Sequence, residues 1–221
     1  MTAGPSSCLR RACAAALAAL VLASPAQAED AVGRLNLAGH RHREMCTGTL
    51  VAPDLVLTAA HCVTVPADGL PKRQADMIFV AGWDGGTHAG ASGIARILVH
   101  PEAYASGRFD LSHDLALVQL REPLTPPPLP VAIADPTGPL TLMGYRRRQP
   151  HRLTVAADCH GAGRAVWMID CRVEQGQSGG PVLAGEGTAR RVVGVISALR
   201  DNAALVVPVD DWVIAQLAKG R

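Results

Sequence analysis

From residue 32 onward, the chain consists of short apolar segments that are repeatedly interrupted by Gly, Pro, Asp or Asn. Short runs rich in Val, Leu and Ile and bounded by turn-forming residues are typical of strands rather than of long helices. The sequence therefore predicts an all-β protein. The expected strands are 32–37, 47–52, 55–58, 77–81, 91–99, 115–120, 141–144, 166–170, 181–183, 192–197 and 205–208.

A proline-rich stretch near the middle of the chain divides this pattern. Residues 123–130 contain five prolines, and proline has no N–H to donate to a sheet ladder. We interpret about 123–130 as a linker between an N-terminal β unit at about 29–122 and a C-terminal β unit at about 131–208.

One helix is expected at the C-terminal end, at about residues 209–219. There Trp212, Val213, Gln216 and Leu217 recur at helical spacing.

Residues 1–28 have the composition of a secretory signal peptide. Arg10 and Arg11 precede an apolar run at 12–23, and the small-x-small sequence Ala26-Gln27-Ala28 follows it. A membrane-spanning helix needs about 20 apolar residues, more than this run offers. We expect cleavage after Ala28 and export to the periplasm or beyond the cell, as a monomer without a membrane anchor.

Four cysteines remain after residue 28, namely Cys46, Cys62, Cys159 and Cys171. An even number of cysteines in an exported chain predicts two disulfides. Of the three possible pairings, Cys46–Cys62 and Cys159–Cys171 close the shortest loops. Zinc binding is the weaker alternative, because neither pair has the two-residue spacing of zinc knuckles.

Charge gives no reason to expect a polyanionic partner. Residues 1–28 carry two arginines and no acidic residue, so 19 basic and 19 acidic side chains remain. Nucleic acids and anionic membranes require clustered basic residues, and the one cluster, Arg146-Arg147-Arg148, is interpreted as a solvated loop. His40 and His42 are interpreted as surface residues, and no metal or organic cofactor is expected.

Three motifs bring together the residue types of nucleophilic catalysis, in which an imidazole activates a hydroxyl and a carboxylate orients the imidazole. His61 closes the segment Leu55-Val-Leu-Thr-Ala-Ala-His61-Cys62, directly after a predicted strand. Asp114 heads the apolar run Asp114-Leu-Ala-Leu-Val-Gln-Leu120, whereas Asp110 lies earlier in a loop. Ser178 lies in Gly176-Gln-Ser178-Gly-Gly-Pro181, where glycines permit a sharp loop.

These motifs, in the order His, Asp, Ser, resemble those of the chymotrypsin-like serine peptidases, in particular the short bacterial trypsin-like and V8-like members. The resemblance extends from Val32 to the C-terminal helix. It implies two six-stranded antiparallel β-barrels followed by that helix, forming one peptidase domain at 29–221. Cys46 also lies where that family places the disulfide partner of Cys62.

The resemblance also implies an endopeptidase that forms an acyl-enzyme on peptide substrates. His61, Asp114 and Ser178 are then the catalytic triad. The backbone N–H groups of Gly176 and Ser178 are then the oxyanion hole, and the carbonyl of Ser197 binds the substrate chain.

The chain departs from the family pattern next to the nucleophile and at the specificity positions. Gln177 stands where members that are activated by cleavage have an aspartate, so we hypothesise that the oxyanion loop is preformed. At the specificity positions, Arg172 either accepts an acidic side chain or points to solvent. Leu199 replaces a glycine there and is expected to narrow or cover the pocket.

Two alternatives to an endopeptidase stay open at this point. One is a weakly active or inactive binding protein on the same fold, which a pocket covered by Leu199 favours. The other is an esterase, because acyl-enzyme chemistry does not demand an amide.

Overall fold

The computed structural model describes Met1 and residues 26–37 and 44–219. The predicted signal peptide lies largely outside the described residues, and so do His40 and His42. Helix α1 (Ala26–Ala31) spans the expected cleavage point.

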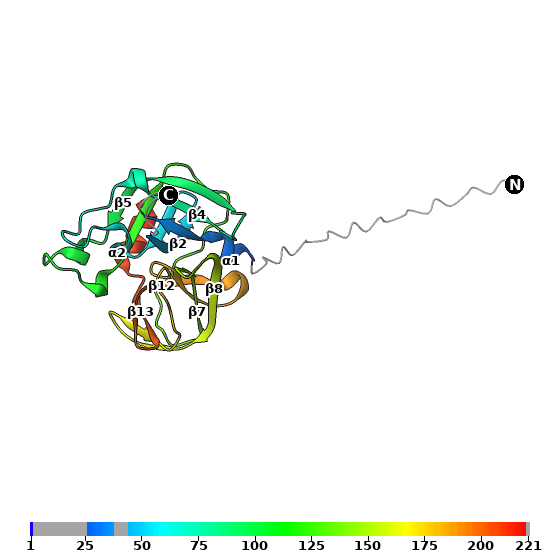
Figure 1. Cartoon of the computed structure of the whole chain (residues 1–221). Coiled ribbons are helices and arrows are strands. Elements are labelled where there is room, and N and C mark those ends of the chain that lie inside the picture. The colour runs from blue at the N-terminus through cyan, green and yellow to red at the C-terminus, as the bar shows by residue number, and fades with distance from the viewer. Residues whose placement is uncertain (2–25, 38–43, 220–221) are drawn as a thin grey trace.

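The N-terminal half of the chain forms a closed six-stranded antiparallel barrel, as predicted. Its strands are β1 (Val32–Asn36), β2 (Met45–Ala52), β3 (Leu55–Thr58), β4 (Ile78–Ala81), β5 (Gly90–Val99) and β6 (Ala116–Leu120). They follow one another in the order β1-β2-β3-β6-β5-β4, and β4 pairs with β1 to close the barrel. This barrel fills the upper part of Figure 1, in blue to green.

Local sequence explains much of this barrel. Pro53 and Asp54 form the turn between β2 and β3, so that Ala52 pairs with Leu55. Phe79 is fully buried inside the barrel. A Cβ on Gly33 would lie 2.5 Å from the Phe79 ring, so the glycine leaves space for this large side chain.

The C-terminal half forms an antiparallel sheet of seven strands where six were predicted, and closure of this sheet into a second barrel stays a prediction. Its strands are β7 (Leu140–Arg146), β8 (Gln149–Cys159), β9 (Gly161–Gly163), β10 (Trp167–Ile169), β11 (Pro181–Ala184), β12 (Arg191–Arg200) and β13 (Ala203–Pro208). The order is β8-β7-β11-β12-β13-β10-β9, so β8 and β9 form its two edges. His160 alone separates these two strands along the chain, and it therefore brings the edges together at one end.

Strands β8 and β9 were not expected from the sequence. β8 is mostly exposed or half-buried along its length, and it contains Gln, Pro, His and Arg in place of a regular apolar alternation. Pairing with β7, from Arg146 to Leu140, holds it in the sheet.

The helices are short. α2 (Ala60–Val63) is a single turn after β3, and α3 (Asp211–Lys219) is the predicted C-terminal helix. Short 3-10 turns occur at Gln74–Asp76, Pro101–Tyr104, Leu111–His113 and Gly187–Ala189. Among the described residues, no helix has the length and apolar character needed to cross a membrane.

Helix α3 leaves the second sheet and packs against the first barrel. Asp210 caps it by accepting a hydrogen bond from the backbone N–H of Val213. The His100 ring lies 4.9 Å from the Trp212 ring, and His100 Nε2 lies 3.0 Å from Asp210 Oδ2. The C-terminal segment therefore connects the second sheet to the first barrel.

The segment between β6 and β7, residues 121–139, contains no helix or strand. The N–H of Leu129 donates to the carbonyl of Leu50 in the first barrel. Directly afterwards, the N–H of Val192 in the second sheet donates to the carbonyl of Pro130. The proline-rich stretch therefore crosses from one unit to the other.

Both predicted disulfides are present in the structure. Cys46 is joined to Cys62, and Cys159 is joined to Cys171. The first links β2 to α2, and the second links the end of β8 to the segment that precedes Ser178.

Candidate active site

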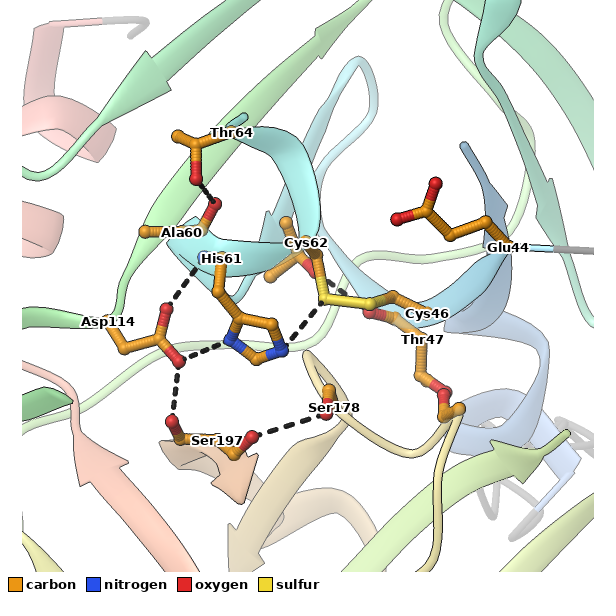
Figure 2. Close-up of a disulfide and its surroundings, with 12 residues drawn as sticks. Glu44, Cys46, Thr47, Ala60, His61, Cys62, Thr64, Asp114, Ser178 and Ser197 are labelled. Atoms are coloured by element: carbon orange, nitrogen blue, oxygen red, sulfur yellow. Dashed lines mark hydrogen bonds and ion pairs between the residues drawn. A yellow bond between two sulfur atoms is a disulfide. The ribbon is translucent and has the colours of Figure 1, made fainter. Parts of the chain in front are cut away.

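The imidazole of His61 lies where the two β units meet, and Figure 2 shows it between Asp114 and the Cys46–Cys62 disulfide. β3 leads into α2 through the fully buried Ala59 and Ala60. Because these side chains are small, the one-turn helix can pack tightly against the barrel. The side chain of His61 keeps an exposed fraction of 35%.

Asp114 is fully buried and directs its carboxylate at His61. Its Oδ2 lies 2.7 Å from His61 Nδ1, and its Oδ1 accepts a hydrogen bond of 2.8 Å from the backbone N–H of His61. The hydroxyl of Ser197 donates to the same Oδ2 at 2.5 Å. Three donors thus surround a carboxylate that is removed from water, and such bonds offset the cost of burying its charge.

The contact with Asp114 also fixes the tautomer of His61. A proton on Nδ1 is needed for the bond to the carboxylate, and Nε2 is then an acceptor. Nε2 lies 3.7 Å from Cys62 Sγ, a disulfide sulfur without a hydrogen to donate. The Nε2 lone pair is therefore available on the side that faces Ser178 in Figure 2.

Asp110, the other acidic residue near this motif, has a different environment. It is exposed and accepts hydrogen bonds from the backbone N–H and hydroxyl of Ser112. The bond from the Ser112 hydroxyl is the main cause that lowers the pKa of Asp110 below its ordinary value. The structure places Asp114, and not Asp110, against the imidazole.

Ser178 lies in a loop of tight turns between β10 and β11. Gly176 and Gly179 have φ angles of 98° and 83°, which side chains strongly disfavour. A Cβ on Gly179 would lie 2.1 Å from the carbonyl oxygen of Thr47. In this structure the hydroxyl of Ser178 donates to the carbonyl of Ser197 at 3.2 Å.

Two backbone N–H groups of this loop are available to a ligand. The N–H groups of Gly176 and Ser178 donate to no atom of the residues that the structure describes. The peptide group between Gln175 and Gly176 is held in place, because its carbonyl accepts a hydrogen bond of 2.7 Å from the backbone N–H of Arg147. The loop therefore presents two donors without protein partners beside a serine hydroxyl.

Thr47, on β2, supports this loop and was not singled out from the sequence. It is fully buried, and its hydroxyl donates to the carbonyl of Gly176 at 2.8 Å. The same hydroxyl accepts a hydrogen bond from the backbone N–H of Tyr145 at 2.9 Å. The backbone N–H of Thr47 donates to the carbonyl of Ser178 at 2.8 Å. Thr47 thus joins the first barrel to the loop and to β7.

Gln177 holds the loop from inside. It is 2% exposed, and its side-chain oxygen accepts a hydrogen bond of 2.8 Å from the N–H of Glu174. Its own N–H donates to the carbonyl of Glu174, and its carbonyl accepts from the N–H of Gly180. These are local bonds within the loop and need no charged partner.

The residues expected to set specificity line a cavity of about 550 Å³. Arg172 and Leu199 lie on its wall together with Glu174 and Gln175. Leu199 is 46% exposed and is itself part of the wall of this cavity, where it was expected to narrow or cover the pocket.

Cys46, His61 and Cys62 form a cluster in which possible metal-ligand atoms lie within 4.8 Å of one another. Both sulfurs are joined in the disulfide and offer no thiolate to a metal. The cluster does not have the donors of a zinc site.

A closed β-barrel packed against a second antiparallel sheet, with His61 held by Asp114 and with Ser178 hydrogen-bonded to Ser197, is the arrangement of the class of chymotrypsin-like serine proteases. Residues 46–195 match the family described as "Trypsin-like peptidase domain". The chain belongs to this family.

Comparison with individual proteins agrees with this assignment. The chain is 37% identical over 107 residues, 47% of its length, to human "Serine protease 56" (Homo sapiens), of which it spans 16%. It resembles the solved structure of thermostable serine protease AL20 from an extremophilic microorganism, with a TM-score of 0.70 and 22% identity over 83% of this chain and 93% of that one. It also resembles a Glu endopeptidase structure, with a TM-score of 0.71 and 18% identity over 87% and 92% of the two chains. The likeness to these two structures supports the fold alone.

Proposed function

We propose that the chain hydrolyses peptide bonds with Ser178 as nucleophile, His61 as general base and acid, and Asp114 as the group that orients His61. The observation that carries this proposal is the contact of the His61 ring with a buried carboxylate on one side, while its Nε2 faces the loop of Ser178. This places the imidazole in the tautomer that accepts a proton.

In the first step, the Ser178 hydroxyl turns from the carbonyl of Ser197 to Nε2 of His61. Hydrogen bonds of this kind commonly tighten only when substrate is bound. Ser178 Oγ then attacks the scissile carbonyl carbon as its proton moves to Nε2. The N–H groups of Gly176 and Ser178 stabilise the oxyanion, and each such donor typically contributes about 3 kcal/mol to the transition state.

The tetrahedral adduct collapses when His61 passes its proton to the leaving amine, which leaves an ester on Ser178. Water attacks this ester as His61 accepts one of its protons. The acid product departs when that proton returns to Ser178 Oγ. Asp114 stays ionised and stabilises the imidazolium in both halves of the reaction.

We further propose that the oxyanion loop needs no activation cleavage. Its support is the set of hydrogen bonds by which Thr47 and Gln177 hold it, none of which uses a new N-terminal amine. A preparation beginning at Glu29 is expected to be active without trimming.

Export to an oxidising compartment is part of the same proposal. Two disulfides are typical of proteins that leave the cytosol. Residues 1–28 are proposed as the signal peptide, residues 29–221 as the peptidase domain, and the mature chain as a monomer without a membrane anchor. The two β units and the connecting segment support the division at about 123–130.

Labelling with a fluorophosphonate tests the nucleophile without assuming a preferred substrate. Ser178 Oγ would displace fluoride from phosphorus, giving a stable phosphonate ester. Label is expected at Ser178 in the wild type and in Ser106→Ala, which removes an exposed hydroxyl elsewhere. It should be absent from Ser178→Ala and strongly reduced in His61→Ala. Equal labelling of Ser178→Ala would contradict the assignment.

Matched ester and amide substrates, assayed side by side, separate a peptidase from an esterase. The binding-protein alternative depends on a pocket closed by Leu199, whereas Leu199 lies on the wall of a cavity of about 550 Å³. A folded protein that neither takes the label nor cleaves either substrate would support the binding-protein alternative.

A further inference from the structure

The cavity beside the Ser178 loop has a strongly basic wall. Its lining is Arg147, Arg148, Arg172, Glu174, Gln175 and Leu199. Three arginines against one glutamate give this lining a formal charge of +2, although residues 29–221 as a whole carry as many acidic as basic side chains. The positive charge is therefore concentrated at this site.

The one carboxylate on the wall, that of Glu174, already forms an ion pair with another arginine. Glu174 Oε1 lies 3.4 Å from Nη1 of Arg146, which is not part of the lining. Among the described residues, no carboxylate lies within ion-pair distance of Arg147, Arg148 or Arg172. Their guanidinium groups are thus available to an anion from outside the chain.

Arg147 is fixed at this wall by two contacts with the segment before the nucleophile. Its backbone N–H donates to the carbonyl of Gln175, and its Nη1 donates to the side-chain oxygen of Gln175 at 3.3 Å. Gln175 directly precedes Gly176, whose N–H is a proposed oxyanion donor. The basic wall therefore adjoins the place where the scissile carbonyl is expected.

The cavity lining also includes Leu199, which lies on β12. Leu199 is the second residue after Ser197, whose carbonyl accepts the hydrogen bond from Ser178. A side chain that precedes the cleaved bond would thus lie between an apolar contact and guanidinium groups. Guanidinium groups bind carboxylates with paired, charge-assisted hydrogen bonds.

We infer that this cavity recognises a carboxylate side chain, so that the enzyme cleaves after acidic residues, with Arg172 and Arg148 as the specificity-determining pair. The inference rests on the proposed function of Ser178. It gives a role to Arg147 and Arg148, which belong to the cluster that the sequence alone left as a solvated loop.

The test compares peptides that differ only in having Glu, Gln, Lys or Leu before the cleaved bond. An exposed ion pair changes an equilibrium by up to about fivefold, so several guanidinium groups together are expected to favour Glu over Gln by about 10- to 100-fold in kcat/KM. Screening by salt should reduce this ratio several-fold between about 0.01 M and 1 M ionic strength.

Substitutions test whether the arginines that line the cavity cause the preference for Glu over Gln. Arg172→Ala should lower the Glu:Gln ratio by about fivefold, and the double variant Arg148→Ala/Arg172→Ala should bring it close to one. Arg172→Glu should favour Lys over Glu. Arg96→Ala, which removes an exposed arginine on β5 in the first barrel, should keep the wild-type ratio.

A Glu:Gln ratio near one, or a ratio that the Arg148 and Arg172 variants leave unchanged, would overturn the inference even if peptides are cleaved and Ser178 is labelled. That pattern leaves the proposed catalytic function intact. If no peptide is cleaved, the affinity of Ser178→Ala for short peptides still tests whether the cavity prefers a carboxylate. Acetylated, amidated tetrapeptides ending in Glu should then bind at least about tenfold more tightly than those ending in Gln, and equal affinities would refute the inference.

Discussion

Replacing Thr47 with valine tests whether a residue of the first barrel positions the oxyanion loop. Valine has nearly the shape of threonine but lacks the hydroxyl. The substitution removes the bond to the carbonyl of Gly176 and the bond from the N–H of Tyr145. It leaves the backbone bond from Thr47 to Ser178 in place.

The expected loss of stability follows from the burial of the two partners. Thr47 is fully buried, and the backbone groups that it satisfies would be left without a partner. Each unsatisfied buried group costs about 1–3 kcal/mol. The free energy of unfolding should therefore fall by about 2–6 kcal/mol for the two groups together.

The expected loss of activity follows from the position of Gly176. Its carbonyl belongs to the peptide that leads into Gln177 and Ser178, so a shift there moves both proposed oxyanion donors. Complete loss of one donor costs about 3 kcal/mol, or a factor of about 100 in kcat. A partial shift should lower kcat by about 10- to 100-fold, with KM changed by less than about twofold.

Thr49→Val is the matched control. Thr49 lies two residues along β2 and is 1% exposed. Its hydroxyl has no hydrogen-bond partner among the described residues. Loss of this hydroxyl should leave kcat unchanged and stability equal or higher. Urea unfolding and steady-state kinetics on one peptide substrate suffice, and equal stability and kcat for the two valine variants would refute the role of Thr47.

Three further outcomes are expected. Asp114→Asn should lower kcat at neutral pH by about 10⁴-fold with little change in fold, because an amide stabilises the wrong tautomer of the imidazole; a loss below about tenfold would count against the triad. Burial is the main cause that lowers the pKa of His100 below its ordinary value, with Asp210 acting in the opposite direction. The unfolded chain therefore takes up the proton first as pH falls below about 6.5, and the free energy of unfolding should decrease through that window in urea titrations, less so in His100→Gln. Replacing Cys46 and Cys62 together by alanine opens a loop with a sequence separation of 16 residues, which should cost about 3 kcal/mol in thermal unfolding, whereas an unchanged midpoint would contradict the estimate.

The sequence alone was sufficient to predict those features of the fold that depend on residues close together along the chain. Short apolar runs between turn formers predicted most strands, and helical spacing around Trp212 predicted α3 to within two residues at its start. The immediate surroundings of His61 and Asp114 also depend on local sequence, because a strand and small residues position the first and a short turn the second. β8 was missed because its exposed, polar sequence carries no regular alternation, and only its pairing with β7 makes it a strand.

The tertiary structure decided which distant groups meet. Thr47 and Gly176 are 129 residues apart in the sequence, and Ser197 and Asp114 are 83 residues apart. No pattern within one segment contains such contacts, because they exist only once both β units are packed together. The basic cavity has the same origin, since Arg148 and Arg172 come from different segments. The sequence determined the chemistry of the residues, and the packing of the two units determined which of them act together.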